Sequence, residues 1–419
     1  MTITRVIDGI CRAEGARVLS GLIGRFRDFD LAEDAMQDAF TKALEVWPAQ
    51  GLPKVPAAWL ATVARRRALD LLRRRRTGPV YTGEPPDLAA PAADDDDHEP
   101  DPADHSGVAD DRLRLLFTCC HPAIGQAAQM ALALRTLCGL STREIARAFL
   151  EPEATTAQRL VRVKKKIVDA GIPYEVPSRE ALPERLRTVL GVAYLVFNEG
   201  YATTEHDGLI RPDLSSEAIR LARLVALLMP DEPEALGLLA LMLHAQARRR
   251  ARRDAQGGYV PLAEQDPARW DTRLIDEAEA LLLRASGLGV IGRYQLEAAV
   301  QSAHVIRRRT GHADWPAIVQ LYDALAALTG SPVVEINRAV AVAETRGAAA
   351  GLAVLDGVAG DARLADYQPY WAARAGLLAR IGAVAEADAA YALAIGLEAD
   401  PAVRRFLQQR RDGLAGRAR

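Results

Sequence analysis

Aromatic residues, cysteine and long apolar runs are scarce in this sequence. Aromatic side chains make up 5% of the 419 residues, whereas Ala, Leu, Arg and Glu are frequent. Because Ala and unbranched side chains lose the least entropy on entering a helix, this composition predicts an all-α protein. The length exceeds that of one ordinary hydrophobic core, so two or three domains are expected.

Features of secreted and membrane proteins are missing as well. The four cysteines, Cys11, Cys119, Cys120 and Cys138, have no CxxC spacing and two are adjacent, which does not suit a disulfide framework. No stretch approaches the roughly 18 consecutive apolar residues of a membrane span, and the first residues lack the basic and apolar segments of a signal peptide. We expect a cytoplasmic protein with reduced thiols and no membrane contact.

Motifs of catalysis are also absent: there is no phosphate-binding loop, nucleophile elbow or metal-binding histidine pair. Cys119, Cys120 and His121 suggest a metal site, but adjacent cysteines rarely bind one zinc ion together, so small buried residues are favoured. Glu199 could serve as a base, yet a helix end at Gly200 explains the same segment. No enzyme activity, cofactor or metal is predicted.

Charge is nearly balanced overall but unevenly distributed. The net charge is −2, yet residues 1–77 contain 14 Lys and Arg against 9 Asp and Glu, and residues 112–173 contain 10 against 4. Residues 78–111 contain 11 acidic residues and no basic one. Clustered Lys and Arg supply the salt-dependent part of nucleic-acid binding, so two basic modules predict a polyanionic partner. For any single cluster of Lys and Arg, the alternative explanation is a helix face exposed to solvent.

Helices are predicted in the first module at residues 5–27, 31–47 and 57–76. Asp30 is the predicted N-cap of the second helix, and Pro48 and Gly51 are expected to end it. Trp47 and Trp59 lie on apolar stripes and are expected in the core, with base stacking as their alternative role. A linker is predicted at residues 78–110. That segment is rich in proline and acidic residues and has almost no large apolar side chains, so it cannot bury enough surface to offset the entropy of ordering.

A helix-turn-helix is predicted within residues 111–177, from residues 142–149 and 155–167, with Ser141 as the first N-cap. The inward positions of the second helix are expected to be Ala157, Leu160, Val161 and Lys164. Its outward or flanking positions are Thr155, Gln158, Arg159, Arg162, Lys165 and Lys166. Arg pairs with guanine, Gln with adenine, and Thr and Lys with phosphates, so this helix suits a major groove.

Residues 178–419 are predicted to form a helical-repeat domain, because helices alternate with Pro, Gly and Asp. The best unit places residues at tetratricopeptide-repeat offsets: Trp371, Ala375, Gly382, Ala387, Tyr391 and Ala394. Small residues let two helices touch and aromatics fill the gap. A regulatory domain similar to tetratricopeptide repeats (TPR-like) is therefore expected.

Two stretches, residues 32–40 and 58–70, resemble region 2 of sigma factors of the extracytoplasmic-function (ECF) group in the sigma-70 family. The helix-turn-helix resembles their region 4, and the two occur in that order with a flexible link and no region 3. Residues 116–122 and the long tail resemble a subgroup with a C-terminal tetratricopeptide-like extension. The resemblance implies an alternative sigma factor that directs promoter recognition, DNA melting and transcription initiation, with the tail modulating its activity.

The resemblance also implies partners and roles. Core RNA polymerase would be bound by Asp34, Gln37 and Asp38. The minus-ten element would be contacted by Lys54, Arg65, Arg66, Arg73 and Arg74, beside a loop at residues 48–57 that would hold a flipped base. The helix-turn-helix would read the minus-thirty-five element, and the tail would bind a protein or peptide. Two departures stand out: the loop is proline-rich, and Leu150, Glu151 and Pro152 replace the usual turn residues.

Two other functions fit parts of the sequence. A helix-turn-helix regulator with a TPR-like interaction domain could recruit polymerase without replacing sigma, but it would need neither the Asp34 face nor the proline-rich loop. A helical scaffold, or an enzyme with a merely helical front half, would show no salt-dependent DNA binding. The basic modules favour the sigma-factor interpretation over both.

Overall fold

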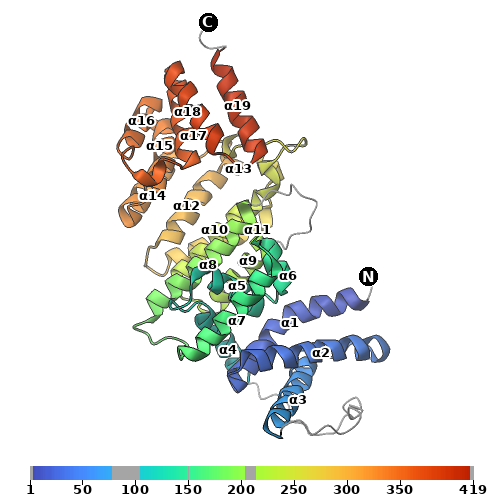
Figure 1. Cartoon of the computed structure of the whole chain (residues 1–419). Coiled ribbons are helices and arrows are strands. Elements are labelled where there is room, and N and C mark those ends of the chain that lie inside the picture. The colour runs from blue at the N-terminus through green and yellow to red at the C-terminus, as the bar shows by residue number, and fades with distance from the viewer. Residues whose placement is uncertain (1–2, 78–103, 150, 203–213, 416–419) are drawn as a thin grey trace. The chain divides into compact units, whose positions relative to one another are not determined.

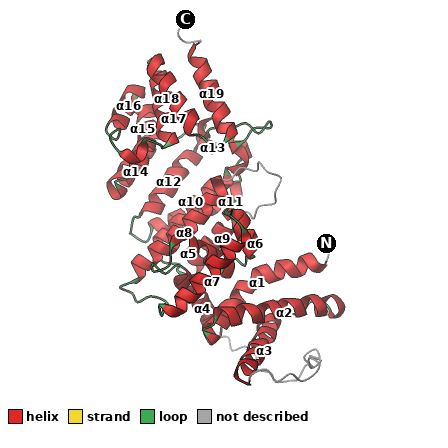
Figure 2. Cartoon of the chain, in the orientation of Figure 1, coloured by secondary structure: helices red, strands yellow, loops and turns green. Residues whose placement is uncertain are grey.

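The computed structural model describes residues 3–149, except 78–103, and residues 151–415, except 203–213 (Figure 1). Its regular structure is helical throughout these residues (Figure 2), apart from one isolated bridge between Arg253 and Tyr259. The predicted all-α class is confirmed. Among the described helices, none is both long and apolar enough to cross a bilayer.

Two compact units make up the chain, residues 1–228 and 229–419. The predicted boundary between the helix-turn-helix and the C-terminal domain lay instead after residue 177. The first unit contains α1 (Ile3–Phe26), α2 (Phe29–Gln50), α3 (Pro56–Thr77), α4 (Asp104–Cys119), α5 (Gln126–Thr136), α6 (Thr142–Ala148), α7 (Glu153–Asp169), α8 (Leu182–Ala202) and α9 (Leu214–Leu228). Thus α8 and α9, which were predicted to belong to the repeat domain, pack with the first unit.

The ends of α2 differ from those predicted. Its N-cap is Asp28 rather than Asp30, and the Asp28 carboxylate accepts a hydrogen bond from the Leu31 amide at 2.9 Å. Pro48 lies inside the helix and Gly51, with a φ of 85°, ends it. A proline near the end of a helix removes only one backbone hydrogen bond, and here the side chain is exposed, so the helix tolerates it.

The first three helices pack on small apolar residues. Leu31 and Ala35 of α2 contact Ala68 of α3, and all three are fully buried. Trp47 is 1% exposed and meets Trp59 edge to face at 5.3 Å between ring centroids. Trp47 is therefore a core residue, as predicted, whereas Trp59 is half-buried and packs against it.

The predicted linker overlaps the start of a helix. Its predicted bounds were 78–110, of which 78–103 lie outside the described residues, but α4 already begins at Asp104. Leu115, Leu116 and Phe117 of this helix are fully buried. The last residues of the predicted linker are therefore the first turns of a helix that is anchored in the core.

The helix-turn-helix has the predicted helices and the predicted first cap. Ser141 caps α6 through a reciprocal capping box with Glu144. The second helix, α7, begins after Pro152, two residues before its predicted start. A local hydrogen-bonded cap fixes the start of α6, which was predicted well, whereas α7 begins after Pro152 without a side-chain cap.

Tyr174, after α7, ties the helix-turn-helix to the first three helices. Its hydroxyl lies 2.9 Å from the carbonyl oxygen of Ser20 on α1 and 3.0 Å from that of Asp111 on α4. Arg27 donates a hydrogen bond to the Tyr174 carbonyl at 2.8 Å and stacks over its ring at 4.8 Å. Burial raises the pKa of Tyr174, so the hydroxyl stays protonated and available as a donor.

The cysteines and α8 complete the core of this unit. Cys119, Cys120 and Cys138 are buried, and burial raises the pKa of Cys119 and of Cys138 to about 12. No group of three metal-ligating side chains occurs among the described residues. Gly200 does not end α8 as predicted, because the helix runs to Ala202. A Cβ at Gly200 would lie 2.3 Å from the Ser215 amide nitrogen, so glycine permits the close approach of α9.

The second unit is built from successive helices. They are α10 (Pro233–Ala247), α11 (Thr272–Ser286), α12 (Arg293–Val305), α13 (Arg307–Thr310), α14 (Trp315–Thr329), α15 (Pro332–Arg346), α16 (Ala348–Asp356), α17 (Gln368–Arg380), α18 (Val384–Leu397) and α19 (Pro401–Ala415). The main contacts join helices adjacent or next but one in the chain. This nearest-neighbour pattern is typical of stacked helical hairpins.

The unit at residues 371–394 forms a helical hairpin, in which α17 and α18 lie side by side (Figure 1). Gly382 turns the chain between them with a φ of 78°. Ala375, Ala387 and Ala394 are fully buried between the helices, and Tyr391 is 6% exposed. The small and aromatic positions thus have the packing roles that the sequence predicted.

Truncation distinguishes the observed boundary from the predicted one. Arg185 on α8 donates to the Phe117 carbonyl at 2.6 Å, and Arg220 on α9 donates to the Cys138 carbonyl. A chain ending at residue 177 loses these contacts and exposes apolar surface. We expect it to be less stable than a chain ending at residue 228 by at least about 2 kcal/mol, measured by urea unfolding. Equal unfolding midpoints would contradict the 228 boundary.

Candidate nucleic-acid and polymerase interface

The polar face of α2 presents two of its three predicted polymerase-binding residues to solvent. Asp34 and Gln37 are exposed. Asp38 is half-buried, and its carboxylate forms an ion pair with Arg67 on α3. Asp38 therefore holds α2 and α3 together, and a partner would meet mainly Asp34 and Gln37.

One side of α3 is basic. Arg65, Arg66, Arg73 and Arg74 are all exposed, and at helical spacing they spread over about half of the helix surface. Lys54 is also exposed, but it lies in the short loop before α3 and is separated from the arginines along the helix. The structure thus groups the four arginines predicted for the minus-ten element and leaves Lys54 apart.

The neighbouring Arg75 has a structural role. Its guanidinium lies 2.9 Å from the Asp28 carboxylate, the N-cap of α2. This contact ties the end of α3 to the start of α2. The arginine run is therefore neither wholly a solvated helix end nor wholly available for a ligand.

The orientation of α7 differs from the prediction. Its buried side is formed by Thr156, Leu160, Val163 and Ile167. Val161, predicted to face inward, is 65% exposed, while Ala157 and Lys164 are half-buried. The helix is rotated from the predicted orientation by about 100°, the angle of one residue. The predicted outward residues nevertheless remain accessible: all six are exposed except Arg159, which is half-buried.

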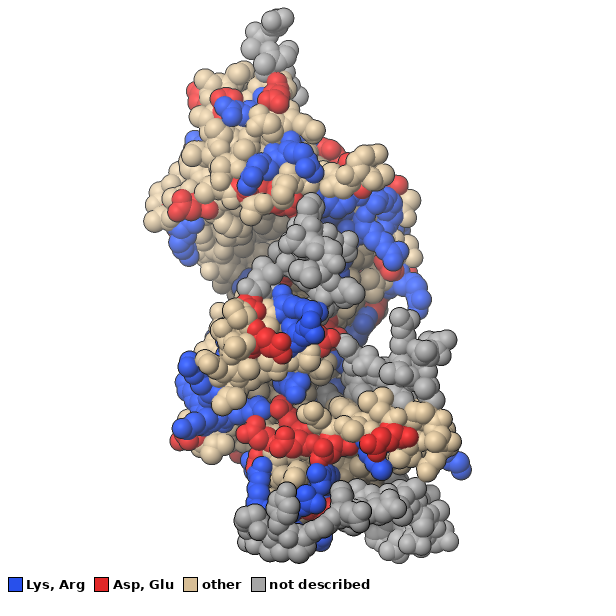
Figure 3. Space-filling model, turned by 45° about the vertical axis from the view of Figure 1, so that its right-hand side comes forward, with Lys and Arg blue, Asp and Glu red and all other residues tan. Residues whose placement is uncertain are grey.

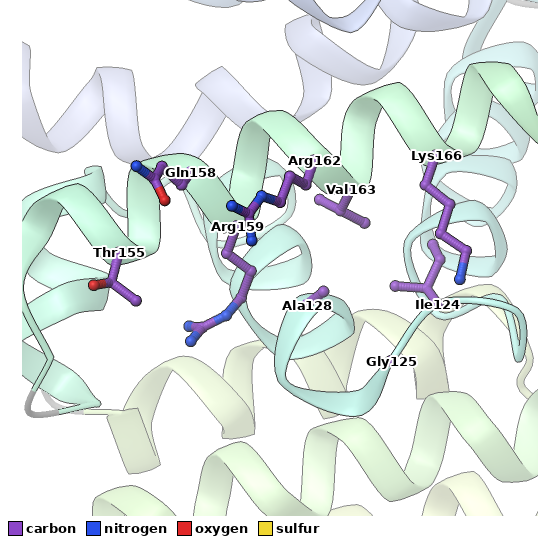
Figure 4. Close-up of a pocket in the computed structure, with 9 residues that line it drawn as sticks. All are labelled: Ile124, Gly125, Ala128, Thr155, Gln158, Arg159, Arg162, Val163 and Lys166. Carbon is purple, nitrogen blue, oxygen red and sulfur yellow. The ribbon is translucent and has the colours of Figure 1, made fainter.

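A hollow of about 260 Å³ separates α7 from the start of α5 (Figure 4). Its lining from α7 is Thr155, Gln158, Arg159, Arg162, Val163 and Lys166. Ile124, Gly125 and Ala128 line the other side. Five of the six residues predicted to read DNA therefore converge on one hollow, and Lys165 lies outside it.

Glu151, in the turn before α7, explains both the buried threonine and the position of Arg159. One carboxylate oxygen accepts from the Thr156 hydroxyl, and the other lies 2.6 Å from Arg159 Nη2. Hydrogen bonding from Arg159 lowers the pKa of Glu151, so the carboxylate is charged at neutral pH. In the sequence, the role of Glu151 was indicated only by the unusual turn. Its partners Thr156 and Arg159 lie five and eight residues further along the chain, so the pairing was not predicted.

Lys164 connects α7, the second helix of the helix-turn-helix, to α2. Its ammonium lies 2.9 Å from Asp30 Oδ1 and 2.7 Å from Glu33 Oε2, and Arg135 of α5 approaches Glu33 at 3.6 Å. Burial lowers the pKa of Lys164, but the two carboxylates outweigh it and the net pKa is raised. The acidic pair is one turn from Asp34 and Gln37, so α7 docks at one end of the polar face of α2.

Charge on this part of the molecule is arranged in bands. In the lower part of Figure 3, a band of acidic side chains has basic side chains above and below it. On this face, opposite charges thus lie close together. A polyanion that binds the basic residues beside the acidic band would therefore contact only a small area there.

Comparison with known proteins gives two family matches. Residues 11–77, which span most of α1 through α3, match the family Sigma-70 region 2. Residues 185–286 match a family of unknown function (DUF6596), a segment that extends from α8 to α11.

The chain is also 41% identical to an uncharacterized protein of Rhizobium meliloti (strain 1021) over 416 residues, 99% of this chain and 97% of that protein. No solved structure matches the chain. Residues 11–77 thus carry a sigma-70 region 2 domain. Over almost its whole length, the chain belongs to the same family as the Rhizobium protein.

The ion pairs of Lys164 should contribute measurably to stability. Lys164→Met leaves the largely buried Glu33 without its nearest cation, since the Lys164 and Glu33 side chains are only 13% and 16% exposed. We expect a loss of roughly 1–3 kcal/mol in the free energy of unfolding. Lys165→Met, on the exposed side of α7, is the matched control and should change stability by less than about 0.5 kcal/mol. Equal losses in the two variants would contradict the docking of α7 on α2.

Glu151 should make stability depend on pH. Because its pKa is lowered in the folded state, its contribution is present above the unfolded pKa of about 4.3 and disappears as pH falls through the folded value. Glu151→Gln should therefore destabilise the protein at pH 7 and match the wild type near pH 3, in denaturant unfolding. Glu153→Gln, two residues away and exposed, is the control. A pH-independent difference for Glu151→Gln would exclude the charged pair.

Proposed function

We propose that this protein is an alternative RNA polymerase sigma factor that directs promoter recognition, melting and initiation. The observation that carries the proposal is the sigma-70 region 2 match on α1–α3, where one helix exposes Asp34 and Gln37 and the next exposes four arginines. A polar face on one helix suits a protein partner. A basic face on its neighbour suits the phosphates of opened DNA.

The helix-turn-helix is proposed to read the upstream promoter element, the minus-thirty-five element. Support comes from the exposed side of α7, where Gln158 and Arg162 can contact base edges and Lys165 and Lys166 can contact phosphates. Arg159 is held by Glu151, so it presents a fixed guanidinium to the hollow. We assign the protein to the ECF type, because residues 78–103 are followed directly by α4 and α5, which belong to the same unit as the helix-turn-helix, so that no separate region 3 domain intervenes.

The second unit is proposed to regulate the first through a protein or peptide partner, as a TPR-like domain. Its stacked hairpins support this role, because such stacks offer extended surfaces for binding chains. The buried alanines between α17 and α18 are the small residues such hairpins require. The proposal gives the sigma function to α1–α7 and regulation to the residues after 228.

Reconstituted transcription tests the function directly. The purified full chain and bacterial core polymerase are incubated with a genomic promoter library, and transcript starts are sequenced. We expect discrete starts that share two upstream elements. Core polymerase alone, with the same library, is the control. No starts beyond that control would reject the proposal.

The polymerase-binding face can be tested by substitution. Asp34→Ala combined with Gln37→Ala removes two exposed side chains, so folding should be unchanged while affinity for core polymerase falls by roughly tenfold or more. Asp38 is left intact because it pairs with Arg67. Glu45→Ala, exposed further along α2, is the control. In a pull-down with core polymerase, unchanged binding of the double variant would refute the assigned face.

A further inference from the structure

Val161 is an exposed apolar side chain in the middle of the polar side of α7. It is 65% exposed, whereas the apolar residues Leu160, Val163 and Ile167 of the same helix are buried. It therefore does not contribute to the core of the first unit. A single exposed apolar residue is ordinary on a protein surface, so its role is judged from its neighbours.

Its neighbours on the surface are the polar residues proposed to contact DNA. Gln158 is one turn before it, Arg162 is adjacent and Lys165 is one turn after it, and all three are exposed. One apolar side chain is thus surrounded by hydrogen-bonding groups. On a helix that enters the major groove, these four positions would face base edges together.

The major groove displays one apolar group, the C5-methyl of thymine. Hydrogen-bonding side chains such as Gln158 and Arg162 cannot recognise a methyl group, whereas an apolar side chain can contact it. Valine suits this task, because its β-branch restricts χ1 in a helix and holds its methyl groups in place at little entropic cost. The three-residue spacing from Gln158 corresponds to about 4.5 Å along the helix axis, close to one base-pair step.

We propose that Val161 is a specificity-determining residue that recognises a thymine methyl in the upstream promoter element. This inference rests on the proposed function and deepens it. Polar residues of α7 read hydrogen-bonding edges, and Val161 distinguishes thymine from cytosine by its methyl group. The upstream element must then contain at least one thymine whose methyl group contributes to binding.

Removing the methyl group from DNA and from protein tests this contact. The probe is a duplex with the upstream element shared by the sequenced transcript starts, in which each thymine is replaced in turn by deoxyuridine. Binding is measured with the full chain assembled on core polymerase. Wild type should bind the duplex roughly three- to fivefold more weakly at one or two substituted positions. At those positions Val161→Ala should bind thymine and deoxyuridine duplexes equally.

Val168 provides a matched control on the same helix. It is 71% exposed and seven residues from Val161, roughly 10 Å along the axis and at the C-terminal end of α7. Val168→Ala removes the same atoms from an equally exposed site, and it should keep the full discrimination of wild type. Both alanine substitutions are at exposed helix positions, so thermal unfolding should be nearly unchanged.

Three results would overturn the inference. An upstream element without thymine, or a wild type that binds every deoxyuridine duplex as well as the thymine duplex, would exclude methyl recognition. If Val161→Ala prefers the thymine duplex over the deoxyuridine duplex as strongly as wild type does, another residue contacts the methyl group. If specific transcription occurs in each case, the sigma-factor proposal stands and only the role of Val161 fails. Absence of specific transcription would reject both.

Discussion

The ammonium group of Lys164 is the point on which the arrangement of the first unit depends. It is largely buried and lies within 3 Å of two carboxylates on α2, which come from a part of the chain more than 130 residues away. Burying a charge is costly unless it is paired and hydrogen-bonded, so this lysine can occupy its position only while Asp30 and Glu33 are opposite it. The rotation of α7 that buries Leu160, Val163 and Ile167 is also the one that places Lys164 opposite these carboxylates.

The same pairing gives α2 two tasks. Its first turns hold the helix-turn-helix, and the next residues, Asp34 and Gln37, are exposed for a partner. Tyr174 strengthens the connection by bridging carbonyl groups of α1 and α4. The helices proposed to bind polymerase and upstream DNA are therefore parts of one packed unit. A polymerase bound to α2 would lie next to the contact that positions α7.

The family matches follow the two-unit organisation only in part. Sigma-70 region 2 corresponds to the first three helices, whereas the family of unknown function begins in α8 and ends in α11, across the boundary at residue 228. The Rhizobium protein aligns with nearly all of both units. The helices after the helix-turn-helix thus include two that complete the first core, and the proposed regulatory role is left to the hairpins that follow.

Sequence alone determined the features that depend on neighbouring residues. The helical class, the capping box of Ser141 and the small-residue hairpin at α17 and α18 follow from composition, local hydrogen bonds and helical spacing. Tertiary structure decided what depends on distant partners: Asp38 pairs with Arg67, α8 and α9 join the first core, and α7 packs with Lys164 against α2 and Val161 toward solvent. Thr156 shows the reason, because a polar side chain becomes a core residue only where a partner such as Glu151 satisfies its hydrogen bond.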